Sequence, residues 1–223
     1  MLAWTGTGTR LGRVTHSMFP LAYLCSAFST RRPPTWPLQF NATFVENFPA
    51  FAPGASNTGR WIYDWPGRRS IFMHGDGQHN NFCACADKAT TAACHLHFMS
   101  DGTMWARFPA TGRCCKVCDA GAGCSTIRPD WLLDATYLGD EEHDGRMCET
   151  WAKPGAVALD VWSQGKDDGR ACQYRERFNF TGKPIWHYLN FSSWVAGAID
   201  ETAFALPSAC KDACPAQYPG HCG

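Results

Sequence analysis

The chain has 223 residues, of which 45% are apolar and 18% are charged, and its 20 basic residues balance its 20 acidic residues. This composition excludes an intrinsically disordered chain, which needs low hydrophobicity and a high net charge. The balanced charge lacks the basic footprint of a nucleic-acid-binding protein, so we expect no nucleic-acid partner. The length predicts one domain with a short leader.

The first 37 residues predict a leader and a linker. Residues 1–30 contain no acidic residue, and their apolar run is followed by small residues, which is typical of a secretory signal peptide. Pro20 interrupts the run, and a translation start at Met18 is the alternative. Residues 31–37 are proline-rich and cannot be helical. No later stretch reaches the roughly 18 apolar residues of a transmembrane span.

Beyond the linker, the dominant pattern is that of β-strands. Phe40, Ala42 and Phe44 alternate with polar residues, which predicts a half-buried strand. Similar patterns recur along the chain, and a turn is predicted at 165–169. The predicted strands are 38–44, 61–65, 68–73, 94–99, 104–108, a hairpin over 137–151 with an acidic tip, 156–162, 170–180 and 185–194.

Little helix is predicted. Residues 109–130 are loop-like, 129–135 form a short helix that begins at Pro129, and 207–223 form a cysteine-rich tail. Eight or nine strands with one or two short helices predict a mainly β domain, an antiparallel barrel or sandwich.

The cysteines predict an oxidising compartment. Apart from Cys25 in the leader, twelve cysteines are dispersed over the chain, and an even, dispersed set is typical of disulfides in a secreted protein. Adjacent cysteines rarely pair with each other, so their members should reach other segments. The predicted disulfide cysteines are Cys83, Cys85, Cys94, Cys114, Cys115, Cys118, Cys124, Cys148, Cys172, Cys210, Cys214 and Cys222.

Three tripeptides match the acceptor pattern for N-glycosylation, at Asn41, Asn179 and Asn190. Beside twelve cysteines, they favour a secreted or secretory-pathway glycoprotein. All three lie in predicted strands, so they also predict which strand faces point to solvent.

Parts of the sequence resemble a known group of proteins. The segments concerned are Gly59-Arg60-Trp61-Ile62-Tyr63-Asp64, Pro129-Asp130-Trp131-Leu132, Tyr137-Leu138-Gly139, Cys148-Glu149-Thr150-Trp151, the strand with Asp160 and Trp162, and Gly182-Lys183-Pro184. Over residues 38–206 they resemble the ependymin-related secreted glycoproteins and the wider group built like bacterial lipoprotein carriers. The resemblance implies a single curved antiparallel sheet, an open half-barrel with a pocket for lipids. The many cysteines between 83 and 124 depart from the ependymin pattern.

Aromatic strands supply the predicted ligand site. Several strands carry large apolar side chains on both faces, whereas a plain soluble sandwich keeps its outer faces polar. The surplus predicts a pocket or a partner surface, and the alternative is that the rings fill the core. The predicted ligand-binding residues are Trp61, Tyr63, Trp65, Leu96, Phe98, Trp186 and Tyr188.

One strand leaves the choice of face open. Asn190 shares a face with Trp186 and Tyr188. If Asn190 carries a glycan, that face is outward, and Ile185, His187 and Leu189 become the pocket side.

Metal and redox chemistry are less favoured. His95 and His97 share a strand face, and Cys115-x-x-Cys118 resembles half a zinc knuckle or a redox motif, but the secretory signals favour disulfides. We therefore expect no metal, no cofactor and no catalytic residue. The carboxylates of Asp64, Asp76, Asp160 and Glu176 show no marked pairing for hydrolysis.

The sequence thus predicts a secreted glycoprotein that binds a hydrophobic small molecule or lipid in a β-lined pocket, without catalysis. A structural or adhesive extracellular protein that contacts glycans or proteins is the second hypothesis. A zinc-dependent or hydrolytic enzyme is the third. No motif specifies an oligomeric state.

Overall fold

A computed structural model describes residues 31–49, 54, 56–77, 92–155, 158–179 and 184–214. The chain divides into two units, residues 1–30 and 31–223. The predicted leader, Cys83, Cys85 and Cys222 lie outside the described residues, so they stay predictions. Among the described residues, no helix has the length and apolar character needed to cross a membrane.

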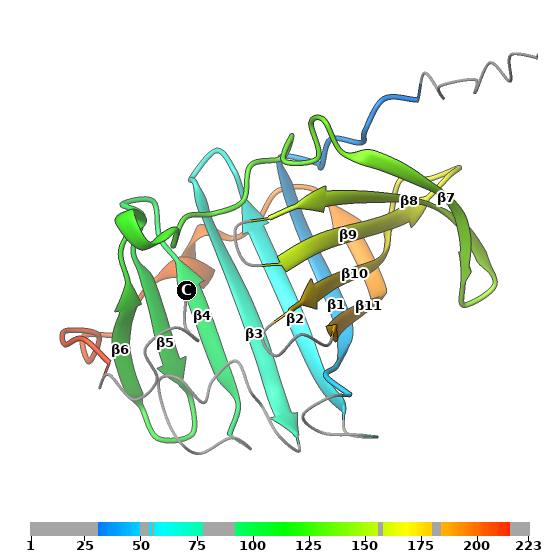
Figure 1. Cartoon of the computed structure of the whole chain (residues 1–223). Helices are drawn as coiled ribbons and strands as arrows, with labels where there is room; N and C mark the ends of the chain where they lie inside the picture. The colour runs from blue at the N-terminus through cyan, green and yellow to red at the C-terminus, as the bar shows by residue number, and fades with distance from the viewer. Residues whose placement is uncertain are drawn as a thin grey trace, which may run out of the picture. The chain divides into compact units, whose positions relative to one another are not determined.

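The described strands form one eleven-stranded antiparallel sheet in the order β6-β5-β4-β3-β2-β1-β11-β10-β9-β8-β7 (Figure 1). It is open, with β6 and β7 at its edges, and β8 and β9 turn across the direction of β2 and β3. The fold is therefore the predicted mainly β, curved, open sheet. The strands are β1 (Gln39–Asn47), β2 (Ser56–Asp64), β3 (Arg69–Gly77), β4 (Cys94–Phe98), β5 (Met104–Phe108), β6 (Arg113–Cys118), β7 (Thr136–His143), β8 (Arg146–Pro154), β9 (Ala158–Gly165), β10 (Ala171–Phe178) and β11 (Ile185–Ala196).

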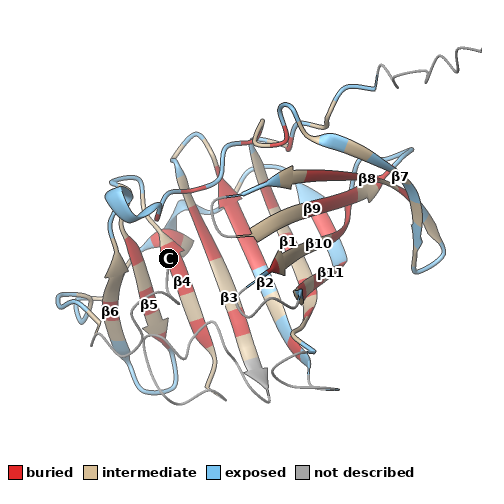
Figure 2. Cartoon of the chain, viewed as in Figure 1, coloured by how far each residue is buried: buried red, intermediate tan, exposed pale blue. Residues whose placement is uncertain are grey.

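The alternation of apolar and polar residues in the sequence matches an alternation of buried and half-buried side chains in the structure. In β1, Phe40, Ala42 and Phe44 are buried, and the residues between them are half-buried (Figure 2). Alternate side chains of a strand point to opposite faces, so the apolar set defines the concave face of the sheet. The predicted hairpin with an acidic tip corresponds to β7 and β8, and Asp144 and Gly145, both at positive φ, form the turn between them.

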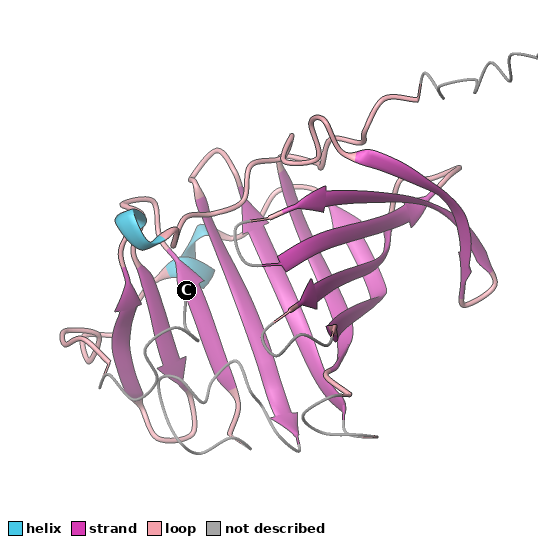
Figure 3. Cartoon of the chain, viewed as in Figure 1, coloured by secondary structure: helices cyan, strands magenta, loops and turns pink. Residues whose placement is uncertain are grey.

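Two predictions of local structure are wrong (Figure 3). Residues 129–134 form turns rather than a helix, and the described helices are the 3₁₀ turns η1 (Ala120–Ala122) and η2 (Glu201–Phe204). β6 lies within the segment expected to be a loop, because its cysteines and basic residues hide the strand pattern. Eleven strands are present among the described residues, rather than eight or nine.

The C-terminal segment covers part of the convex face. Phe204 of η2 packs on Ile62 and Ile71, and all three side chains are buried. Beyond it, the chain pairs with the edge of β6, where the Lys116 amide donates to the Asp212 carbonyl at 2.8 Å. One free edge of the sheet is thereby closed.

Four disulfides join described cysteines, as the cysteine pattern predicts. Adjacent Cys114 and Cys115 do not pair with each other, and both bind the C-terminal segment. The pairs are Cys114–Cys210, Cys115–Cys214, Cys118–Cys124 and Cys148–Cys172, and Cys94 is also disulfide-bonded.

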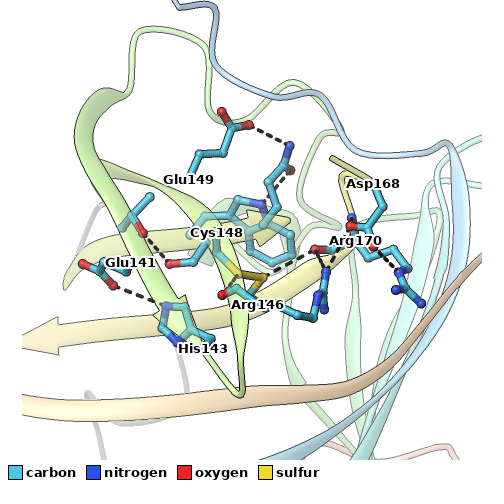
Figure 4. Close-up of a disulfide and its surroundings, with 12 residues drawn as sticks. Glu141, His143, Arg146, Cys148, Glu149, Asp168 and Arg170 are labelled. Carbon is cyan, nitrogen blue, oxygen red and sulfur yellow. Dashed lines mark hydrogen bonds and ion pairs between the residues drawn. A yellow bond between two sulfur atoms is a disulfide. The ribbon is translucent and has the colours of Figure 1, made fainter. Parts of the chain in front are cut away.

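The Cys148–Cys172 disulfide links β8 to β10 at one end of β9. Close by, Asp168 in the β9–β10 turn pairs with Arg146 at 3.0 Å and with Arg170 at 2.7 Å (Figure 4). The disulfide and these ion pairs fix this part of the sheet against the β9–β10 turn.

Candidate functional site

The concave face carries a dense group of aromatic rings, which we call the aromatic cluster. Strands from both halves of the sheet contribute to it, because the sheet curves around its own concave face. The buried members of this cluster are Trp36, Phe40, Ala42, Phe44, Trp61, Tyr63, Leu132, Trp151, Trp162, Ala171, Leu189, Phe191 and Trp194.

Five of the predicted ligand-binding residues lie on this face. Trp61 and Tyr63 belong to the aromatic cluster, and Trp65 packs against it. Leu96 and Phe98 belong to a neighbouring apolar cluster around Cys94 and Cys115. Phe72 packs against both clusters, so they form one continuous apolar surface.

Trp186 and Tyr188 lie on the opposite face. β11 pairs with β10 so that Tyr188 faces Arg175, while Leu189 faces Tyr174 on the concave side. The prediction of a common pocket with Trp61 is therefore wrong for these two residues. His187 and Leu189 are the buried concave residues, which is the alternative that the position of Asn190 had left open.

Two segments outside the sheet cover the aromatic cluster. The ring of Trp36 contacts those of Trp61 and Trp162 at 5.0 and 4.8 Å. Residues 119–135, which we call the strap, join β6 to β7, the two edges of the sheet, and cross its mouth (Figure 1). Leu132 of the strap is fully buried in the cluster.

Backbone carbonyls of alternate strap residues anchor it. Trp36 donates its amide to the Pro129 carbonyl at 2.9 Å. The Tyr63 hydroxyl donates to the Ile127 carbonyl at 2.8 Å. Lys153 donates its ammonium to the carbonyls of Trp131 and Leu133, at 2.7 and 2.6 Å. Four hydrogen bonds, none of them part of a sheet ladder, thus anchor the strap, in addition to the Cys118–Cys124 disulfide at its β6 end.

Four indole N–H groups of the cluster are buried without a hydrogen-bond acceptor in the described protein. They belong to Trp36, Trp61, Trp131 and Trp151. Trp162 differs, because its indole donates to the Gln164 side chain at 3.1 Å. Buried tryptophans usually find a partner, and an unmet donor costs roughly 1–3 kcal/mol.

Next to the aromatic cluster, the concave face carries six titratable side chains that are linked by close polar contacts. We call this group the acid–base chain. Glu46 lies 2.8 Å from His74 Nδ1 and 3.3 Å from His187 Nε2. His187 Nδ1 lies 2.9 Å from Glu176. The Tyr174 hydroxyl lies 3.1 Å from Glu176 and 2.8 Å from Asp160. In sheet order the members come from β3, β1, β11, β10 and β9.

Burial and charge pairing set the protonation states of the side chains in the acid–base chain. Burial opposes the charge of Glu46, but His74 and His187 outweigh it and lower the pKa of Glu46 to about 2. Burial also opposes a charged His187, but Glu176 and Glu46 raise its pKa to about 9. Burial, helped by Glu176, raises the pKa of Asp160 to about 6. His187 is therefore a buried cation between two carboxylates.

The candidate metal and redox motifs have other roles. Cys115 and Cys118 are bonded to Cys214 and Cys124, so they form neither a zinc knuckle nor a redox pair. His95 and His97 lie on the convex face, and burial, with neighbouring Arg107, lowers the pKa of each to about 4. In the part of the chain that the structure describes, no group of three or more ligating residues could hold a metal ion.

Comparison with known proteins gives a family. The model described as "Domain of unknown function (DUF8395)" matches residues 35–164, more than half of the chain. The chain belongs to this family. No ependymin model matches it, and no curated protein matches its sequence.

Solved structures show the fold alone. An uncharacterised conserved protein from Thermus thermophilus is 10% identical, with a TM-score of 0.50, over 77% of this chain and 87% of that one. MucB in the Pseudomonas aeruginosa MucA/MucB complex is 15% identical, with a TM-score of 0.33, over 78% and 57%. PNGF-II is 9% identical, with a TM-score of 0.35, over 78% and 31%. This chain thus spans little more than half of MucB and about a third of PNGF-II.

The DUF8395 match covers most of the aromatic cluster but not the whole sheet. It begins beside Trp36 and ends within β9. β10 and β11 follow it in sequence, yet they lie between β9 and β1 in the sheet. The matched region therefore needs these two strands to complete the concave face, and the acid–base chain draws Tyr174, Glu176 and His187 from them.

Several concave residues were missed from the sequence. The sequence pattern places Trp36 in the linker and Trp131 in a helix, whereas in the structure both cover the aromatic cluster. Glu46 continues the apolar phase of Phe40, Ala42 and Phe44 in β1. A charge in the buried phase of a strand is the signal that could have pointed to the acid–base chain.

Proposed function

We propose that this DUF8395 domain binds an apolar small molecule or lipid on its concave face, as a carrier without a catalytic step. The observation that carries the proposal is the set of four buried indole donors that lack acceptors. A core that only needed filling could use phenylalanine, which also packs as an aromatic ring and has no donor to satisfy. The carboxylate or ester oxygens of a bound lipid can accept from Trp61 and Trp151, the two of these indoles that belong to the sheet.

Ligand entry has to displace part of the cover. The rings are in mutual contact, so an acyl chain would take the place of Trp36 and Trp131, two rings that come from segments outside the strands. Beyond the Cys118–Cys124 disulfide, four hydrogen bonds anchor the strap, and segments with few anchoring bonds open at low free energy. The disulfides favour an oxidising compartment, in which such a carrier would act outside the cytosol.

Binding fits the acid–base chain better than catalysis does. Its carboxylates and imidazoles are paired with one another and lie beneath the aromatic cluster. A general base has to reach a substrate proton at hydrogen-bond distance. The acid–base chain instead makes one end of the concave face polar.

The test uses the full chain, made through a eukaryotic secretory route and purified without reductant. Native mass spectrometry is expected to show apolar adducts that dissociate on activation. Titration with a brominated long-chain fatty acid is expected to quench tryptophan fluorescence, because the bromine approaches the aromatic cluster. Trp61→Phe removes one donor and is expected to weaken binding about tenfold, since a lost hydrogen bond is worth roughly 1 kcal/mol or more.

Trp105→Phe is the matched control. Trp105 faces away from the cluster, and its indole already donates to Thr103 at 2.9 Å, so the affinity should stay unchanged. A fully oxidised protein without adducts that does not respond to the fatty acid would sink the carrier proposal and favour the adhesive alternative.

A further inference from the structure

The convex face of β10 and β11 carries a regular arrangement of side chains, which we call the outer ladder. Its three rows are direct cross-strand pairs. They are Gln173 with Asn190, Arg175 with Tyr188, and Arg177 with Trp186. At about 3.3 Å per residue, the ladder extends roughly 13 Å along β11 from Asn190 to Trp186.

The two rings of the ladder form a continuous platform. The rings of Trp186 and Tyr188 are stacked at 6.0 Å, with 22° between their planes. The guanidinium groups of Arg175 and Arg177 lie 5.8 and 5.9 Å from the Trp186 ring. Both rings are half-buried, so the platform is open to solvent on one side.

Asn190 heads this platform and lies within an N-glycosylation tripeptide. Gln173 donates to its side-chain oxygen at 2.7 Å, and its amide donates to Asn47 at 3.2 Å. A glycosylated amide keeps its oxygen and one N–H, so both hydrogen bonds are compatible with an attached sugar. The two bonds orient the side chain at the head of the ladder.

Asn41 and Asn190 lie on the convex face of the sheet. Asn41 lies in β1 opposite the buried phase, and Asn179 is exposed directly after Phe178, a concave residue. Of the three, Asn190 has an aromatic residue two positions earlier on its own face. Asn41 has Gln39 there, and Asn179 has Arg177.

We propose that Asn190 carries an N-linked glycan whose first sugars pack on Tyr188 and Trp186. In the attachment step, Asn190 Nδ2 bonds to the anomeric carbon of an N-acetylglucosamine. The bond from that carbon to the diphosphate of a polyprenyl-linked oligosaccharide donor breaks, and one Nδ2 proton leaves. The apolar C–H face of a pyranose then covers the negative face of each ring, and the guanidinium groups donate to its oxygens.

The first measurement is site occupancy in protein secreted from a eukaryotic host. Enzymatic release of the glycans in heavy-oxygen water converts each occupied asparagine to a labelled aspartate, and peptide mass spectrometry locates it. Label is expected at Asn190. An unlabelled Asn190 in the secreted protein overturns the proposal.

The second measurement tests the platform with a double-mutant cycle of Asn190→Gln and Tyr188→Thr. In the wild-type background, loss of the glycan is expected to lower the thermal midpoint by about 2–4 °C more than in the Tyr188→Thr background. The same four proteins from a bacterial periplasm lack the glycan, and their coupling should vanish. Asn41→Gln should have equal effects in both backgrounds. Equal coupling with and without glycan overturns the packing on Tyr188, whatever the outcome of the carrier test.

Discussion

Glu46→Gln tests whether the acid–base chain stabilises the fold through its charges. The substitution keeps the shape of the side chain and removes the anion between His74 and His187 (2.8 and 3.3 Å). His187 then remains a buried cation, and Glu176, 2.9 Å from its Nδ1, remains as a carboxylate partner. Breaking a buried ion pair from one side costs about 3–5 kcal/mol. For a unit of this size, the thermal midpoint should fall by roughly 10 °C at pH 7.

The pH dependence gives a sharper readout. Because the pKa of His187 is raised to about 9, its contribution is complete below its ordinary value of 6.5 and is lost as the pH rises through 9. Because the pKa of Glu46 is lowered to about 2, its contribution is complete above 4.5 and is lost as the pH falls through 2. Asp160, with its pKa raised to about 6, lowers stability as the pH rises from 3.8 through 6. His95 and His97, with the pKa of each lowered to about 4, raise stability as the pH rises from 4 through 6.5, so stability should be greatest at about pH 6–7.

In the Glu46→Gln variant, the pKa of His187 moves back towards 6.5, so the alkaline loss of stability should still begin near pH 6.5 but be smaller and end at lower pH. Thermal unfolding followed by tryptophan fluorescence from pH 4 to pH 10 measures both effects. Glu142→Gln, at an exposed position of β7, is the control and should reproduce the wild-type profile. A variant with the wild-type midpoint and the wild-type alkaline limb would refute the assignment of His187 as a buried cation.

Two further changes test the packing and the cover. A Cβ at Gly59 would lie 2.2 Å from the Phe44 ring and 2.9 Å from the Met73 carbonyl. Gly59→Ala should therefore lower the free energy of unfolding, measured in urea, by about 1–3 kcal/mol. Gly121→Ala is the control and should leave this free energy unchanged, because the space around Gly121 is open. Lys153→Met removes two hydrogen bonds that anchor the strap. The backbone amide hydrogens of residues 128–135 should therefore exchange with solvent at least tenfold faster. Unchanged hydrogen exchange would show that Lys153 does not hold the strap.

The strands were predictable where one face is apolar and the other polar. β1, β5 and the β9–β10 hairpin follow from period-two alternation and from turn residues between them. β6 was not predictable in this way, because Cys114, Cys115 and Cys118 serve disulfides and interrupt the alternation. Its strand conformation depends on pairing with β5 and with the C-terminal segment, which are tertiary interactions.

The candidate site was predictable only in part, because face assignment depends on the register of the whole sheet. Trp61 and Tyr63 could be grouped, since both alternate in one strand. Trp186 and Tyr188 have the same pattern, and only the pairing of β11 with β1 and β10 shows that they point outward. The sequence contained one pointer to this outcome in Asn190, since a glycan acceptor has to face solvent.

The order of the strands explains why this concave face is covered. β6 and β7 are consecutive in the chain but lie at opposite edges of an eleven-stranded sheet, so the segment between them has to cross the mouth. The strap is therefore a consequence of the topology, and Trp131 and Leu132 adapt it to an apolar surface. Because it is tied at both ends by edge strands, it can lift in the middle without unfolding the sheet. A ligand would then compete with the strap for one surface, so variants that loosen the strap should bind faster, and variants that remove indole donors should bind more weakly.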